Sequence, residues 1–218
     1  MLDNKFWELH YERFSVTEPS AFAMFCADEW IDDRDTVVEI GCGNGRDGVF
    51  LATKCSEYYA VDSSTKAIEQ FERRLGPSKS QSNIKLFCGD VKDFDLRKII
   101  PKAGGKIFLY LRFSLHSLDE ETEKYILTEF AQLTHPGVLA VEARTIFDPL
   151  HGVGIPVGRN AFMTDHYRRF IDPLDFLGFA IGQTALKFFV LSDGFAITET
   201  EDPIVLRAIL CTRLGINK

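Results

Sequence analysis

The residues whose spacing most clearly indicates chemistry form a glycine-rich turn with an acidic residue just before it. Gly41, Gly43 and Gly45 follow the apolar segment 37–40, which contains Glu39. Glycine has no side chain, so a turn of this kind between a strand and a helix lets the backbone approach a ligand closely. Glu39 would repel a phosphate group on the turn and would suit a cationic ligand. The turn therefore predicts a ligand site, and Glu39 favours a cation.

A second interpretation of the same turn is a dinucleotide site. Residues 43–48 have the spacing G-x-G-x-x-G, and Asp62 lies near the offset expected for an acid that binds a ribose. Glu39 counts against this interpretation, because a pyrophosphate would rest beside its carboxylate. A dinucleotide-binding G-x-G-x-x-G motif that begins at Gly41, directly after the strand, would also need glycine at position 46, where the chain has Arg46. An NAD(P)-dependent oxidoreductase is therefore the alternative from another enzyme class.

The turn belongs to a chain in which apolar, strand-like segments alternate with amphipathic helical ones. Strands are predicted over residues 36–40, 58–61, 84–88, 106–111 and 138–143. This alternation predicts a mostly parallel, doubly wound sheet with helices on both faces, a Rossmann-like three-layer α/β/α fold. The late apolar segments 186–191 and 204–211 are joined by too short a link for a crossover helix, so we expect an antiparallel C-terminal hairpin.

Capping residues predict where the helices begin. The expected starts are Thr17 for a helix over 17–31, Asp47 for a helix over 47–54, Ser63 or Ser64, the capping-box spacing Ser117 to Glu120, and Asp172-Pro173. The helix after Ser117 is expected to end at Pro136-Gly137.

Acids at two further strand ends extend the pattern of the glycine turn. Asp62 follows strand 58–61, and Asp90-Val91 follow strand 84–88. Together with Glu39 and the three glycines, they resemble the class I S-adenosylmethionine-dependent methyltransferases, with consistent spacing from residue 36 to about 145. The first motif of that family places an acid in a strand just ahead of a G-x-G-x-G turn. The alternative is that Glu39 and Asp90 are ordinary acidic residues in solvent at the ends of strands, and that Asp62 only caps a helix.

The resemblance implies an enzyme that binds S-adenosyl-L-methionine and releases S-adenosyl-L-homocysteine. Asp62 would accept hydrogen bonds from the ribose hydroxyls, and Glu39 would serve the charged methionine end. Asp90 and the Val91 N–H would bind the adenine. The residues assigned to the donor are Tyr11, Glu39, Gly41, Cys42, Gly43, Asp62, Ser63, Asp90, Val91 and Leu111.

Candidate acceptor residues follow the fourth and fifth predicted strands. A hydroxyl acceptor wants a nearby base, whereas a phosphate or carboxylate acceptor wants arginine or lysine around it. Segment 144–171 is too long for a routine connection and is expected to be a substrate loop. The residues assigned to catalysis are Tyr110, His116, Arg144, His166 and Arg168, with Arg144 and Arg168 as an anion clamp and His116 or His166 as a base. The alternative is that Arg168 and Arg169 form a solvated pair, that His166 is a hydrogen-bonded structural histidine, and that the backbone satisfies His116.

Several of these segments also resemble a bacterial subgroup of methyltransferases that is associated with surface-polysaccharide and phosphate-decorated glycan biosynthesis. The resemblance is carried by segments 7–11, 110–116, 142–148 and 165–170. It implies O-methyl transfer to a hydroxyl or anionic oxygen of a small molecule or glycan precursor, phosphorylated or neutral, and an N-terminal segment that folds over the donor. Other interpretations are transfer to nitrogen, sulfur or a macromolecule, and a donor-binding regulatory module without turnover.

Composition restricts the class of protein and of partner. The chain has 218 residues, 45% hydrophobic and 26% charged, as in an ordinary globular domain. We expect one domain with a helical segment 1–35, a donor core 36–143, the substrate loop 144–171 and a C-terminal part 172–218. The net charge of −7 argues against a nucleic-acid partner. The N-terminus lacks a leader pattern and no apolar run is long enough to span a membrane, so a cytoplasmic protein is expected.

The five cysteines predict neither a disulfide framework nor a metal centre. They lie at positions 26, 42, 55, 88 and 211, with no C-x-x-C pair and no histidine at zinc-ligand spacing. Cys26, Cys55, Cys88 and Cys211 have apolar neighbours in the sequence and are expected to be buried and inert.

Overall fold

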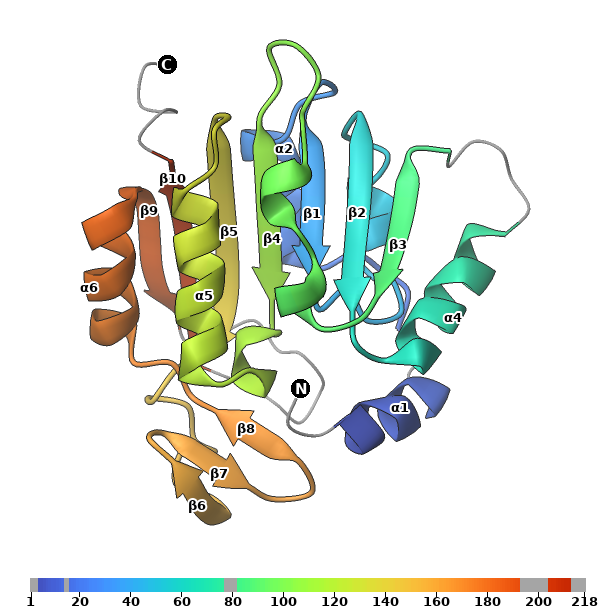
Figure 1. Ribbon diagram of the computed structural model, residues 1–218. Coiled ribbons are helices and arrows are strands. Elements are labelled where there is room, and N and C mark those ends of the chain that lie inside the picture. Colours follow the sequence, from blue (N-terminus) through green and yellow to red (C-terminus); the bar gives the residue numbers. More distant parts are fainter. Residues whose placement is uncertain (1–3, 14–15, 77–81, 193–203, 213–218) are drawn as a thin grey trace.

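The computed structural model describes residues 4–13, 16–76, 82–192 and 204–212, and its centre is a seven-stranded sheet (Figure 1). The strands are β1 (Thr36–Ile40), β2 (Glu57–Asp62), β3 (Ile84–Cys88), β4 (Ile107–Arg112), β5 (Gly137–Arg144), β9 (Ala185–Ser192) and β10 (Val205–Cys211). Their order is β3-β2-β1-β4-β5-β10-β9, and the first five pair in parallel. β10 runs antiparallel to β5 and to β9. The predicted Rossmann-like sheet and its antiparallel C-terminal pair are confirmed, while residues 193–203, which link that pair, lie outside the described residues.

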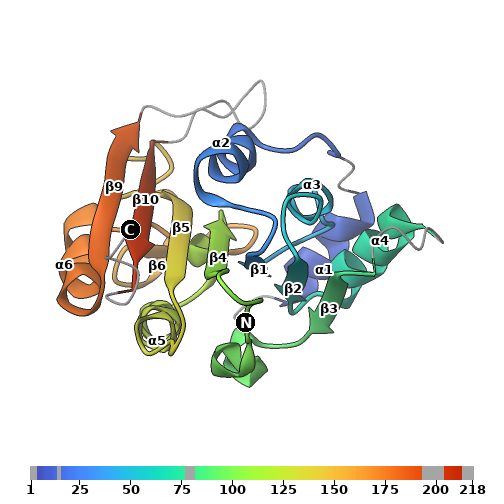
Figure 2. The ribbon, with the colours of Figure 1, turned by 90° about the horizontal axis from the view of Figure 1, so that it is seen from above.

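Helices cover both faces of the sheet, as Figure 2 shows from above. The α-helices are α1 (Asn4–Arg13), α2 (Ala21–Trp30), α3 (Gly48–Leu51), α4 (Thr65–Leu75), α5 (Glu120–Ala131) and α6 (Pro173–Gln183). The short 3-10 helices are η2 (Val91–Asp93), η3 (Leu96–Lys98) and η4 (Leu115–Ser117). No helix in the described part of the chain is long and apolar enough to cross a membrane.

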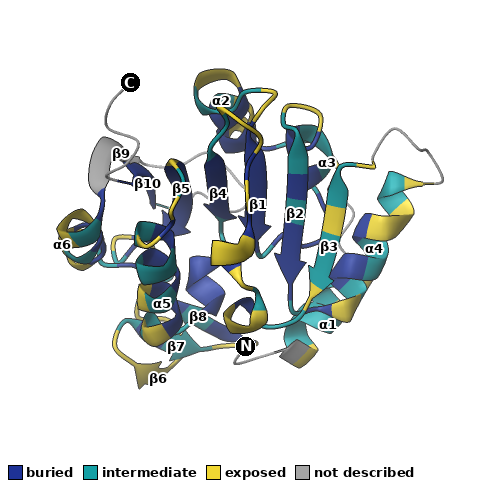
Figure 3. Cartoon of the chain, turned by 45° about the horizontal axis from the view of Figure 1, so that its top comes forward, coloured by how far each residue is buried: buried dark blue, intermediate teal, exposed yellow. Residues whose placement is uncertain are grey.

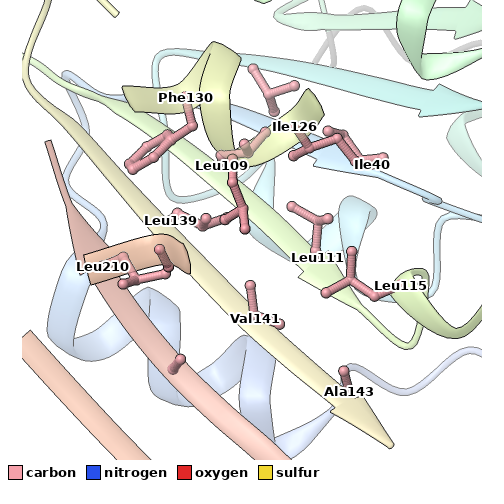
Figure 4. Close-up of a cluster of buried hydrophobic side chains, with 14 of the residues drawn as sticks. Ile40, Leu109, Leu111, Leu115, Ile126, Phe130, Leu139, Val141, Ala143 and Leu210 are labelled. Carbon is pink, nitrogen blue, oxygen red and sulfur yellow. The ribbon is translucent and has the colours of Figure 1, made fainter. Parts of the chain in front are cut away.

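Alternating side chains of the strands build one hydrophobic core on each face. In β4, Leu109 and Leu111 pack with α5 and α6 (Figure 4), whereas Phe108 and Tyr110 pack with α2, α3 and α4. This period of two follows from the pleat of a strand. Burial is deepest along the central strands, as the dark colour of β1 and β4 shows in Figure 3.

Four of the expected helix boundaries are wrong, one of them being the end of α5, which lies at Ala131 and not at Pro136-Gly137. α2 begins at Ala21 rather than at Thr17, because Ser20 caps it and is itself held by the carboxylate of the buried Asp47. The helix expected over 47–54 is only the single turn α3. At α5 the cap is Asp119, which accepts a hydrogen bond from the Thr122 N–H, and not Ser117. Ser64 and Asp172 are confirmed as caps of α4 and α6.

Segment 144–171, the predicted substrate loop, has secondary structure of its own. It contains a three-stranded antiparallel sheet formed by β6 (Ile155–Gly158), β7 (Ala161–Met163) and β8 (Tyr167–Arg169). A parallel bridge joins Thr145 to Ile171, so the segment leaves and rejoins the main body at one point. Figure 1 shows this small sheet at the carboxyl ends of the parallel strands, on the opposite side from α1.

The cysteines follow the expected pattern with two departures. Cys26 and Cys211 are buried, Cys55 is half-buried and Cys88 is exposed. Cys88 is exposed because it ends β3, the edge strand of the sheet.

Candidate active site

A cavity of about 370 Å³ lies at the carboxyl ends of the parallel strands, between α1 and the small sheet. Nearly all of the predicted site residues line it. From the donor set these are Tyr11, Glu39, Gly41, Cys42, Gly43, Asp62, Ser63, Asp90 and Val91, and from the acceptor set His116, Arg144, His166 and Arg168. Residues that lie more than 150 positions apart in the sequence therefore share one cavity.

Asp62, at the end of β2, binds the backbone of the glycine turn that follows β1. Gly43 has φ +54°, a conformation that L side chains rarely adopt, and its N–H donates to Asp62 Oδ2 at 2.9 Å. The other oxygen, Oδ1, accepts from the Ser64 N–H at the start of α4, also at 2.9 Å. Asp62 thus fixes the turn and keeps its carboxylate at the cavity wall.

Two acids of the cavity, Glu39 and Asp62, are buried. Glu39 is 4% exposed, and burial, followed by the charge of Asp47, holds its pKa well above the usual value although the Tyr58 hydroxyl donates to it. Burial also raises the pKa of Asp62 against the opposing effect of its backbone N–H donors. Asp90 accepts from the Lys92 N–H at the start of η2 and lines the same end of the cavity. This end is suited to hydroxyl donors and to cations.

α1 covers the cavity with one aromatic face. A Cβ built on Gly43 would lie 2.5 Å from the Tyr11 hydroxyl, so the tyrosine packs directly on the turn. Phe6 stacks on the ring of His166 with centroids 4.0 Å apart, and Trp7 lies 6.1 Å from the ring of His116. Phe6 and His10 also line the cavity, although neither was among the predicted site residues. Their spacing with Trp7 and Tyr11 is that of one helical face, which is the signal that identifies them.

The other end of the cavity carries arginines. Arg112 at the end of β4 donates to Glu142 Oε1 at 3.0 Å, and Arg144 at the end of β5 donates to Asp148 Oδ2 at 2.9 Å. Arg168 comes from β8 of the small sheet. Carboxylates behind the cavity wall orient two of the guanidinium groups, so this end is suited to an anionic group.

The two histidines of the acceptor end have different surroundings. His116, in η4, is 8% exposed, and its Nδ1 has no hydrogen-bond partner among the described residues. Burial, followed by the charges of Arg144 and Arg168, lowers its pKa well below the usual value, so the ring is neutral at pH 7. His166 is also buried, but its Nδ1 lies 2.7 Å from Asp165 Oδ1.

Tyr110 and Leu111 do not line the cavity. The Tyr110 hydroxyl donates to Asp47 Oδ2 at 2.9 Å on the α2 side of the sheet. The Leu111 side chain is fully buried in the core on the α5 side. From this part of the chain, Arg112 and residues 113, 114 and 116–118 of the segment that follows β4 line the cavity. Tyr110 is therefore placed away from the acceptor end, and the Leu111 side chain away from the donor end.

Known proteins with similar sequences include methyltransferases and a synthase. Residues 37–137 match the family described as "Methyltransferase domain". A probable cobalt-precorrin-6B C(15)-methyltransferase (decarboxylating) from Methanococcus maripaludis is 30% identical over 101 residues, 44% of this chain and 54% of that protein. A carboxy-S-adenosyl-L-methionine synthase from Shewanella loihica is 21% identical over 56% of this chain and 49% of its own length. The chain thus spans about half the length of these curated relatives.

Solved structures with the same fold extend the similarity to most of the chain. An S-adenosylmethionine-dependent methyltransferase from Methanosarcina mazei has a TM-score of 0.64 at 15% identity, over 85% of this chain and 95% of that one. Geranyl diphosphate C-methyltransferase from Streptomyces coelicolor A3(2), solved with Mg²⁺, geranyl diphosphate and S-adenosyl-L-homocysteine, has a TM-score of 0.59 at 12% identity, over 88% of this chain and 77% of that one.

Proposed function

We propose that this chain, whose residues 37–137 match the family described as "Methyltransferase domain", is a class I S-adenosylmethionine-dependent methyltransferase that transfers the donor's methyl group to an oxygen atom of its acceptor. The observation that carries the proposal is the division of one cavity into an acidic end around the glycine turn and an end with histidine and arginine. S-adenosyl-L-methionine supplies a methyl carbon activated by a positively charged sulfur. The acidic end fits such a cation, and the other end fits an acceptor.

The residues present fit the donor. Asp62 has two oxygens at the cavity wall and would bind the ribose hydroxyls, while Asp90 and the Val91 N–H would bind the adenine. Glu39 lies at the turn, where its negative charge would favour the sulfonium and ammonium groups. The buried, Tyr58-bonded position of Glu39 argues against a pyrophosphate on this turn and so against the NAD(P)-dependent alternative.

The acceptor that we propose is a small molecule or a glycan precursor, phosphorylated or neutral, that is methylated on a hydroxyl or an anionic oxygen. Arg144 and Arg168 would hold an anionic group, and His116 or His166 would serve as a base for a hydroxyl. α1, which covers the cavity, would exclude water and help to align the two reactants. Alignment is the main source of acceleration in an in-line displacement. Because the curated relatives include a C-methyltransferase by name, transfer to carbon, nitrogen or sulfur is the competing proposal.

Thermal unfolding with four ligands at equal concentration tests the donor. S-adenosyl-L-methionine and S-adenosyl-L-homocysteine are expected to raise Tm, whereas NAD and NADP are not. A ligand at 100 times its Kd adds about 2.7 kcal/mol, or roughly 5–10 °C for a chain of this length. A shift with NAD or NADP alone would reject the proposal in favour of an oxidoreductase.

A further inference from the structure

We infer that the acceptor carries a hydroxyl group next to an anionic group, that Arg144 and Arg168 bind the anion, and that His116 accepts the hydroxyl proton. The inference rests on the proposed function and deepens it, because it selects the hydroxyl and not the anionic oxygen as the methylated atom. It also selects His116, and not His166, as the base.

The position of His116 places it at the junction of the two ends of the cavity. A Cβ built on Gly41 would lie 2.5 Å from the Ser114 Cβ, so the loop after β4 packs against the glycine turn. His116 follows Ser114 by two residues, and both line the cavity. A hydroxyl at His116 therefore lies between the donor turn and the arginines.

The charged and titratable groups that face His116 come from β5, from β8 and from the turn before β8. Arg144 ends β5, and Arg168 and Arg169 belong to β8, while His166 comes from the turn before β8. Arg169 is not among the residues that line the cavity; it forms a buried ion pair with Glu123 and donates to the Leu118 carbonyl. Arg144 and Arg168 line the cavity, so an anion bound there would sit beside the imidazole.

The surroundings of the two histidines decide which one is the base. His166 stacks on Phe6 and lies beside Asp165, contacts that dock α1 on the small sheet. His116 has an enclosed Nδ1 that no described residue hydrogen-bonds, in a side chain more than nine-tenths buried. A buried polar atom of this kind is costly unless a ligand satisfies it. The ring of His116 is therefore available to the acceptor.

The chemistry requires a base only for a hydroxyl. An anionic oxygen has no proton to lose, so arginines alone would suffice for it. For a hydroxyl, the oxygen forms a bond to the methyl carbon and the carbon–sulfur bond breaks, with its electron pair left on sulfur. The hydroxyl proton moves to a ring nitrogen of His116, and the imidazolium then releases it to solvent.

Anion titrations followed by NMR test the inference without knowledge of the acceptor. Protein with ¹³C,¹⁵N-labelled histidine is saturated with S-adenosyl-L-homocysteine and titrated with inorganic phosphate and, separately, with acetate at pH 7.5; His116→Asn identifies the ring signals. We expect saturable binding of at least one anion, movement of the His116 signals, and a neutral His116 ring in the bound state. Tighter binding of phosphate or of acetate distinguishes a phosphate from a carboxylate on the acceptor.

Three variants complete the test. Arg144→Gln and Arg168→Gln are each expected to weaken anion binding at least about tenfold, whereas Arg159→Gln is not, because Arg159 pairs with Asp175 outside the cavity. The inference is overturned if neither anion saturates, if binding survives both variants, or if His116 is protonated with the anion bound. Failure to bind S-adenosyl-L-homocysteine would instead contradict the proposed function, and titration without it would still test the anion site.

Discussion

The carboxylate of Glu8 accepts a hydrogen bond from the backbone N–H of Thr65, 2.7 Å away, at the start of α4. Its second oxygen accepts from the Lys66 N–H at 3.0 Å. A carboxylate at a helix N-terminus is stabilised both by the free N–H groups and by the helix dipole. Glu8 therefore anchors α1 at the donor end of the cavity, while the stack of Phe6 on His166 anchors it at the acceptor end.

Removal of the Glu8 anchor is expected to loosen α1 and to weaken donor binding. The loss of a charge-assisted cap costs about 0.5–2 kcal/mol, so Glu8→Ala should weaken S-adenosyl-L-homocysteine binding by up to about tenfold. Calorimetry measures the affinity, and hydrogen exchange over residues 4–13 should become faster. The matched control is Glu12→Ala, an exposed acid on the same helix. Equal effects of the two substitutions would contradict the role of Glu8.

A side chain at Gly43 is expected to disrupt the donor site specifically. Gly43→Ala would force Tyr11 away and strain a residue with φ +54°. Gly76 also has a positive φ, +60°, but a Cβ there meets nothing within 4 Å. Both substitutions should cost about 1–2 kcal/mol of stability. Only Gly43→Ala should weaken S-adenosyl-L-homocysteine binding, by at least about tenfold, and calorimetry on both variants checks this.

The donor half of the site was predictable because its signals are local. The positions of Glu39, Asp62 and Asp90 follow from strand ends in a parallel sheet, and the sheet order brings those ends together. Tyr110 was misplaced because a strand sends adjacent side chains to opposite faces, and the period alone does not say which face meets a ligand.

The features that the sequence did not reveal depend on contacts between distant segments. Ser20 caps α2 because Asp47 holds it, and the start of that helix shifts accordingly. β6 was not predicted because its four residues include Pro156 and Gly158, which are disfavoured within strands. The stack of Phe6 on His166 joins residues 160 positions apart, and neither residue carries a local signal for it.

Glu39 is expected to make stability depend on pH. Its folded-state pKa lies above the unfolded value, so its stabilising contribution is complete below the unfolded pKa and is lost as pH rises through the folded pKa. Glu39→Gln keeps an acceptor for Tyr58 without the buried charge. The variant should therefore gain stability relative to the natural protein as pH rises above the ordinary glutamate pKa, although its donor affinity falls. Urea unfolding across that range is the measurement, and a constant difference would contradict the shift.

Tyr110 is expected to contribute stability and not catalysis. Tyr110→Phe removes one donor from Asp47, which keeps its hydrogen bonds from the Ser20 N–H and Oγ. The cost should be about 1 kcal/mol, with unchanged affinity for S-adenosyl-L-homocysteine. Tyr125→Phe is the control, since that hydroxyl makes only an exposed contact of 3.5 Å with the Lys92 carbonyl. A loss of donor affinity in Tyr110→Phe would place Tyr110 in the site after all.

His116 is expected to set the acid limb of the pH–rate profile. An acceptor is first identified by incubating the protein and labelled donor with a small-molecule extract. With that acceptor, kcat/KM should rise with pH as the His116 imidazole loses its proton. The rise should occur below the usual histidine pKa, because the pKa of His116 is lowered. His116→Asn should remove this limb and reduce kcat by about 10²–10⁴-fold with donor affinity unchanged. His166→Asn should keep the limb and alter binding instead, because His166 docks α1. Retention of the limb in His116→Asn and its loss in His166→Asn would reverse the assignment.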